Sequence, residues 1–132
     1  MKKRTTIVLL VCMLATIAGA VSVTAAPKNV QIWKGYWGFE GEPEPVDTWK
    51  GWFYNDQFII RAWWIGHTEK VTLTTVHYNR DTGNFYGTVE FRGTYGYFSG
   101  TEYHEDGYCN LNMDIHWNGN TWNNVWFLGM KV

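Results

Sequence analysis

The strongest constraint on this chain is the spacing of its apolar residues, which recur at every second position rather than every third or fourth. In the clearest segment, 108–117, five apolar residues alternate with polar ones: Cys109, Leu111, Met113, Ile115 and Trp117. Because successive side chains of a strand point to opposite faces, this pattern predicts a half-buried antiparallel strand. No segment after residue 26 has the period of an amphipathic helix, so the sequence predicts an all-β fold.

Turn residues divide the rest of the chain into short strands. Examples are Asn55-Asp56, the polar loop 79–84, and Asn118-Gly119, a strong hairpin signal. The predicted strands are 30–39, 48–54, 57–65, 71–78, 85–91, 94–103, 108–117 and 121–130. Short consecutive connections favour an up-and-down antiparallel meander of about eight strands. We expect it to close into a barrel, which removes exposed strand edges; an open meander or a two-sheet sandwich is the alternative.

Two segments of the chain resemble each other. Residues 33–37 read Trp-Lys-Gly-Tyr-Trp, and residues 49–53 read Trp-Lys-Gly-Trp-Phe. Glycine in a strand permits sharp bending or the close approach of a neighbouring ring. We therefore expect these glycines to relieve crowding among large aromatic side chains.

The first 26 residues have the pattern of a secretory signal peptide. Lys2, Lys3 and Arg4 precede an uncharged apolar stretch, 7–23, and small residues follow up to Ala26. We expect cleavage after residue 25 or 26, leaving one domain, 27–132, that is secreted or associated with the cell envelope. The alternative is an uncleaved membrane anchor, because the stretch is near the shortest length that spans a bilayer.

The two cysteines indicate whether an exported chain could carry a lipid anchor or a disulfide. Cys12 does not fit a lipid anchor, because Val11 rather than a small residue precedes it. Cys109 is then the single cysteine of the mature chain, so it cannot form an internal disulfide. We expect it to be a small buried hydrophobe, with an intermolecular disulfide as the alternative.

Charge narrows the classes of partner. Removing the leader leaves 8 basic residues against 12 acidic ones, a net charge of about −4. A nucleic-acid-binding domain needs a basic footprint, so we expect no nucleic-acid partner. An anionic membrane surface is disfavoured for the same reason, and a membrane partner is expected only if the leader is retained.

Aromatic residues are the most informative side chains. Four of the nine tryptophans share strand parity with apolar neighbours and are predicted to face the core: Trp33, Trp49, Trp64 and Trp117. Four other rings share a face with charged residues and are predicted to form an exposed patch: Tyr36, Trp52, Tyr54 and Trp63. Exposed apolar patches usually mark interaction sites. The alternatives are that the loop 40–47 covers these rings, or that they only pair across strands.

Flat rings beside polar donors suit sugars, whose C–H faces stack on aromatic side chains. The leading hypothesis is therefore an exported, non-enzymatic domain that binds a carbohydrate or cell-surface polymer through this patch. The alternatives are a structural or adhesive envelope protein that self-associates, and a barrel that holds a small apolar ligand inside it. The third alternative is a small hydrolase.

Motifs for metal or catalytic chemistry are weak. Glu40, Glu42, Glu44 and Asp47 could supply oxygen ligands to calcium, but their spacing is not that of an EF-hand, so we expect a solvated acidic loop. Asp114 and His116 share a strand face and are the candidates for the hydrolase alternative. The sequence contains no HExxH, CxxC or serine-elbow motif, and we expect no metal or cofactor.

Overall fold

A computed structural model describes residues 30–105 and 107–132 of the chain, and every element in it is a β-strand. The strands are β1 (Gln31–Gly38), β2 (Asp47–Phe53), β3 (Phe58–Trp64), β4 (Glu69–Tyr78), β5 (Asn84–Phe91), β6 (Thr94–Glu105), β7 (Tyr108–Trp117) and β8 (Asn120–Lys131). They agree with the predicted strands to within a few residues. The predicted leader and Cys12 lie outside the described residues.

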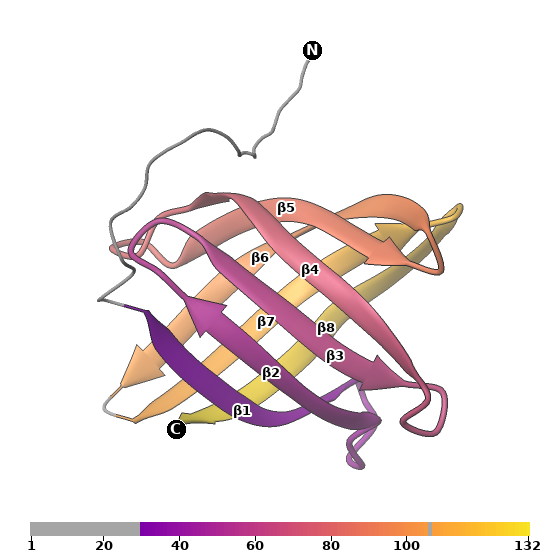
Figure 1. Ribbon diagram of the computed structural model, residues 1–132, viewed down its shortest axis with the longest axis horizontal. Helices are drawn as coiled ribbons and strands as arrows, with labels where there is room; N and C mark the ends of the chain where they lie inside the picture. The colour runs from indigo at the N-terminus through magenta and orange to yellow at the C-terminus, as the bar shows by residue number, and fades with distance from the viewer. Residues whose placement is uncertain (1–29, 106) are drawn as a thin grey trace.

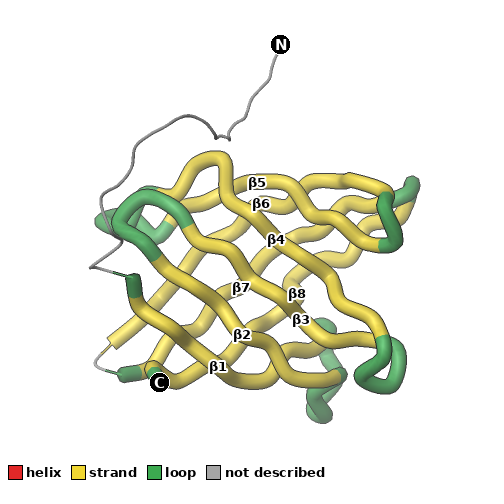
Figure 2. Tube along the Cα trace, viewed as in Figure 1, coloured by secondary structure: helices red, strands yellow, loops and turns green. Residues whose placement is uncertain are grey.

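The eight strands close into an antiparallel barrel, which confirms the predicted meander and its closure. Each strand pairs with the next, and β8 returns to pair with β1. The strands cross obliquely, with β1 to β4 in front of β6 to β8 (Figure 1). The connecting loops lie at the two ends of the barrel (Figure 2). No helix among the described residues is long and apolar enough to cross a membrane.

The two ends differ in their side chains. We call one the tryptophan end; it carries the loop 39–46 and the turns that follow β3, β5 and β7. The other end carries residue 30, residue 132 and the turns that follow β2, β4 and β6, and we call it the Glu102 end after a buried carboxylate described below.

Alternate side chains of every strand fill the barrel. Phe58, Ile60, Leu73, Leu111 and Val125 are fully buried at its centre. Trp33 and Trp49 are buried with them, and Trp64 and Trp117 pack against the same core while remaining partly exposed. The predicted inward parity of these four tryptophans is therefore confirmed.

The two similar segments are cross-strand neighbours. Gly35 of β1 lies opposite Trp49 of β2, and Gly51 of β2 lies opposite Trp33 of β1. A Cβ on Gly51 would lie 2.9 Å from the Trp49 ring, and one on Gly129 would lie 2.5 Å from the same ring. The Trp49 indole thus fits because Gly51 and Gly129 flank it, which agrees with the expected relief of crowding at Gly51. At Gly35 a Cβ would instead meet the backbone of β8, so this glycine permits close approach of two strands rather than of a ring.

Candidate functional site

A groove runs over the outer face of β1, β2 and β3 and has a volume of about 420 Å³. That volume falls within the range of about 300–1,000 Å³ typical of ligand sites. We call it the aromatic groove; its lining residues are Lys34, Gly35, Tyr36, Thr48, Trp49, Lys50 and Trp63. No residue of the loop 39–46 lines it, so that loop does not form its walls.

The groove exists because a small side chain lies between two large ones. Thr48 is the cross-strand partner of Tyr36, and the ring of Tyr36 is 57% exposed. Trp63 lies on β3, and Trp49, the neighbour of Thr48, pairs with Ala62, the neighbour of Trp63. The short side chain of Thr48 therefore lies between the rings of Tyr36 and Trp63, which are aromatic walls.

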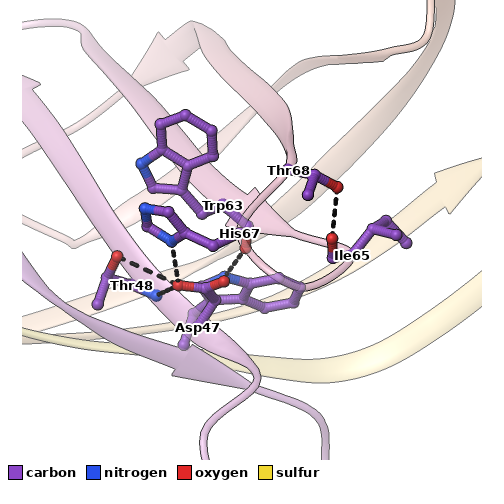
Figure 3. A network of polar contacts seen from close by, with 7 residues as sticks. Asp47, Thr48, Trp63, Ile65, His67 and Thr68 are labelled. Carbon is purple, nitrogen blue, oxygen red and sulfur yellow. Dashed lines mark hydrogen bonds and ion pairs between the residues drawn. The ribbon is translucent and has the colours of Figure 1, made fainter.

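Trp63 is held from two sides (Figure 3). Its backbone carbonyl accepts a hydrogen bond of 2.8 Å from Nε1 of Trp37. The His67 ring stacks on its indole, with centroids 4.3 Å apart and planes inclined by 24°. His67 is fixed in turn by Asp47, whose Oδ1 lies 2.8 Å from its Nδ1. One wall of the groove is therefore held in a defined orientation.

Asp47 begins β2 and connects the groove wall to the barrel. Its Oδ1 also accepts a hydrogen bond of 2.7 Å from the backbone N–H of Thr48. Burial alone would raise the pKa of Asp47, but the hydrogen bonds from His67 and Thr48 outweigh burial and lower the pKa below its ordinary value. This carboxylate therefore stays ionised and positions His67. Within the described ranges, no three acidic, histidine or cysteine side chains gather as a metal site.

The groove unites two of the four predicted patch residues, Tyr36 and Trp63. Trp52 is half-buried beside the groove, where Lys50 Nζ lies 5.2 Å and the Arg61 guanidinium carbon 5.4 Å from its ring centroid. Tyr54 is half-buried just beyond the end of β2 and does not line the groove.

The barrel interior offers much less room. A cavity of about 40 Å³ lies at the tryptophan end, enough for only a few water molecules. Its lining is entirely apolar: Trp37, Phe39, Ala62, Trp64, Val71, Leu73, Val89, Phe91, Ile115, Trp117, Trp122 and Phe127. The internal space is therefore far smaller than a typical ligand site, and the outer groove is the better candidate.

The Glu102 end holds a polar cluster that the sequence analysis missed. The Glu102 side chain is only 3% exposed, and it accepts hydrogen bonds from the Tyr78 hydroxyl and from Nδ1 of His104, 3.0 Å away. Burial, and then the bond to Glu102, raise the pKa of Tyr78 far above its ordinary value. The available signal was strand parity, since Glu102 lies four residues after the buried Phe98 and so faces inward.

The proposed hydrolase pair does not form a unit. Asp114 accepts a hydrogen bond of 2.9 Å from the backbone N–H of Asn124. His116 instead bonds through Nδ1 to the Thr121 hydroxyl, at 2.9 Å, and stacks on Tyr97. A register shift between Met113 and Ile115 interrupts β7 at Asp114, which separates the partners of these two residues.

Comparison with known proteins adds no assignment: no family model, curated protein or solved structure matches this chain. The groove is therefore the feature from which a function can be proposed.

Proposed function

We propose that this protein is an exported, non-enzymatic binding domain that takes a glycan in the aromatic groove. The observation that carries the proposal is a groove of about 420 Å³ with aromatic walls, Tyr36 and Trp63, and polar side chains between them. Sugar rings combine apolar C–H faces with hydroxyl groups. The walls can stack on the C–H faces, while the ammonium groups of Lys34 and Lys50 and the hydroxyl of Thr48 can bond to the hydroxyls.

The contacts that fix the Trp63 indole strengthen this interpretation. An exposed indole that could turn freely would lose conformational entropy on binding, whereas this one is already stacked on His67. The Asp47–His67–Trp63 arrangement thus gives one wall a fixed orientation before any ligand arrives. Export is also part of the proposal, and it is based on the predicted signal peptide.

The test measures binding of soluble polysaccharides to the purified mature domain, by isothermal titration and affinity electrophoresis. A suitable panel is hydroxyethylcellulose, mannan and polygalacturonate. Tyr36→Ala and Trp63→Ala should each weaken binding about tenfold or more, the loss typical of an interface anchor.

Tyr97→Ala is the matched control. Tyr97 is exposed on β6, and its ring stacks on His116 at 4.5 Å and 22°, much as Trp63 stacks on His67. Its removal should leave binding unchanged, and thermal melts of all variants report whether the fold survives. Absence of saturable binding to the whole panel, or an equal loss in Tyr97→Ala, would contradict the proposal.

Self-association is a second candidate, favoured by one observation. Tyr108, Leu128 and Met130 are exposed on β7 and β8 and continue the surface beside Tyr36, the partner of Leu128. Such an apolar strip suits a contact between copies of the chain. Sedimentation velocity at rising concentration tests it, and a strictly monomeric protein at high concentration would refute it.

A further inference from the structure

Three basic residues form a row across the outer face of the barrel. Lys34 of β1 is the direct partner of Lys50 of β2, and Lys50 is the direct partner of Arg61 of β3. All three side chains are exposed. Neighbouring strands lie about 4.8 Å apart, so the row presents one positive charge per strand at that interval. We call these three residues the basic row.

This arrangement costs stability, because like charges directly opposite each other on neighbouring strands repel. None of the three basic residues forms an ion pair within the described ranges, where the ion pairs are His67–Asp47, Arg92–Glu69 and His104–Glu102. Two of the three cations, Lys50 and Arg61, instead lie over the Trp52 ring. The row is therefore a concentrated positive region on a chain whose total charge is negative.

The basic row and the aromatic groove are parts of one surface. Lys34 and Lys50 line the groove beside Tyr36, and Arg61 precedes the wall residue Trp63 by two positions on β3. A linear polymer lying across the three strands would meet the aromatic walls and the row of charges together. One charge per strand also suits a polymer with one negative group per sugar.

We propose that the ligand of the groove is an acidic polysaccharide, a polyuronate whose carboxylates lie along Lys34, Lys50 and Arg61. This rests on the glycan-binding function proposed above and specifies its substrate class. Carboxylate is the favoured group because its planar pair of oxygens matches the guanidinium of Arg61. Lys34 and Lys50 act as point charges for the neighbouring sugars.

The test compares two forms of one polymer, polygalacturonate and its fully methyl-esterified form, which keeps the sugar backbone and removes the charge. At low salt the acid should bind at least about tenfold more tightly than the ester. Its affinity should fall as the salt concentration rises, because salt screens exposed charges. Lys50→Gln should weaken binding of the acid about fivefold and that of the ester much less, because glutamine keeps a hydrogen-bond donor but loses the charge.

Lys131→Gln is the charge-matched control, because Lys131 does not line the groove: it pairs with the core-facing Trp33 and so has the opposite strand parity to Lys34. It should change affinity less than about twofold at about 0.15 M salt, because its ammonium group lies on the other side of the strand from the basic row and does not meet a ligand in the groove. Lys50→Gln removes repulsion in the row and also the contact of Lys50 with the Trp52 ring. Because these opposing effects are each about 1 kcal/mol or less, the melting temperature should stay close to that of the parent protein, which separates lost binding from lost folding.

The outcomes distinguish the two proposals. Equal binding of the acid and the ester, with loss in Trp63→Ala, would overturn the polyuronate inference and leave glycan binding in place. Tighter binding of dextran sulfate or of a single-stranded oligonucleotide than of polygalacturonate would replace the polyuronate with a general polyanion and also overturn it. Binding of neither form, nor of the neutral panel, would remove the proposed function itself.

Discussion

Alanine at Gly35 would test how tightly the barrel closes between β1 and β8. A Cβ at this position would lie 1.7 Å from the carbonyl oxygen of Leu128 and 2.6 Å from Cα of Gly129. Ordinary van der Waals contact begins at 3.4 Å, so the two strands must separate by up to about 1.7 Å, the difference between the contact and observed distances. The obstructing atoms are backbone, so no side-chain rotation can relieve the clash.

The loss of stability can be estimated from the interactions that are weakened when β1 and β8 separate. Nε1 of Trp49 donates to the carbonyl oxygens of Tyr36 and Leu128, at 3.0 and 3.1 Å, so it bridges the two strands that must part. Overpacking costs about 1–3 kcal/mol and each weakened hydrogen bond about 1 kcal/mol. We expect Gly35→Ala to lower the free energy of unfolding by about 3 kcal/mol, or the melting temperature by roughly 10–20 °C.

Urea unfolding followed by tryptophan fluorescence measures this loss, and amide hydrogen exchange shows whether it is confined to β1 and β8. Lys34→Ala is the control, because it changes an exposed side chain on the same strand. If Gly35→Ala unfolds within about 0.5 kcal/mol of the parent protein, the size of an ordinary surface substitution, the tight seam is refuted.

Three further predictions concern polar groups of the barrel. Tyr78→Phe removes a donor from the buried Glu102 carboxylate and should lower unfolding stability by about 1–3 kcal/mol in urea; unchanged stability would contradict that bond. Burial raises the pKa of the Cys109 thiol to about 12, so a maleimide at pH 8 should label it only in denaturant; rapid native labelling or a disulfide-linked dimer would contradict this. The pKa of Asp47 is lowered on folding, so this residue adds stability above the unfolded pKa of about 3.9, which is lost as pH falls through the folded pKa. Asp47→Asn should therefore cost about 1 kcal/mol at pH 7 and less at pH 2–3 in thermal melts; equal losses at both would refute the linkage.

Much of the fold was predictable because a strand has a period of two that a short sequence window reveals. The alternation in β7 and the Asn118-Gly119 turn locate the last hairpin, and strand parity alone assigns Trp33 and Trp49 to the core. Closure also followed from physics, since eight strands joined by short connections can pair first to last and remove both edges.

The candidate site was only partly predictable. Parity placed Tyr36 and Trp63 on the outer face, but whether two rings flank one groove depends on register and on the small Thr48 between them. The contact between His67 and Trp63 could not be predicted either, because His67 lies in a turn with positive φ, where strand parity does not apply.

Irregularities in the strands limited what strand parity could predict for the remaining polar residues. The sequence pattern treated Asp114 and His116 as one face, while the register shift in β7 gives them different partners. The inward direction of Glu102 was open to the same parity argument as the core. A carboxylate in a barrel interior is unfavourable unless it is paired, and its partner Tyr78 is 24 residues away, so no local pattern indicates the pair.

Pairing of β8 with β1 has a consequence for how the chain must fold. Trp33 and Lys131, partners at this seam, are 98 positions apart in the sequence, so the closing contact carries the largest loop-closure cost in the barrel. Until it forms, β1 and β8 are two open edges, on which stray chains can template aggregation. Lys34 and Lys131 place a charge on each of these edges, a recognised deterrent to such pairing. The same lysine that we assign to ligand binding in the finished barrel therefore also protects the chain while the seam is still open.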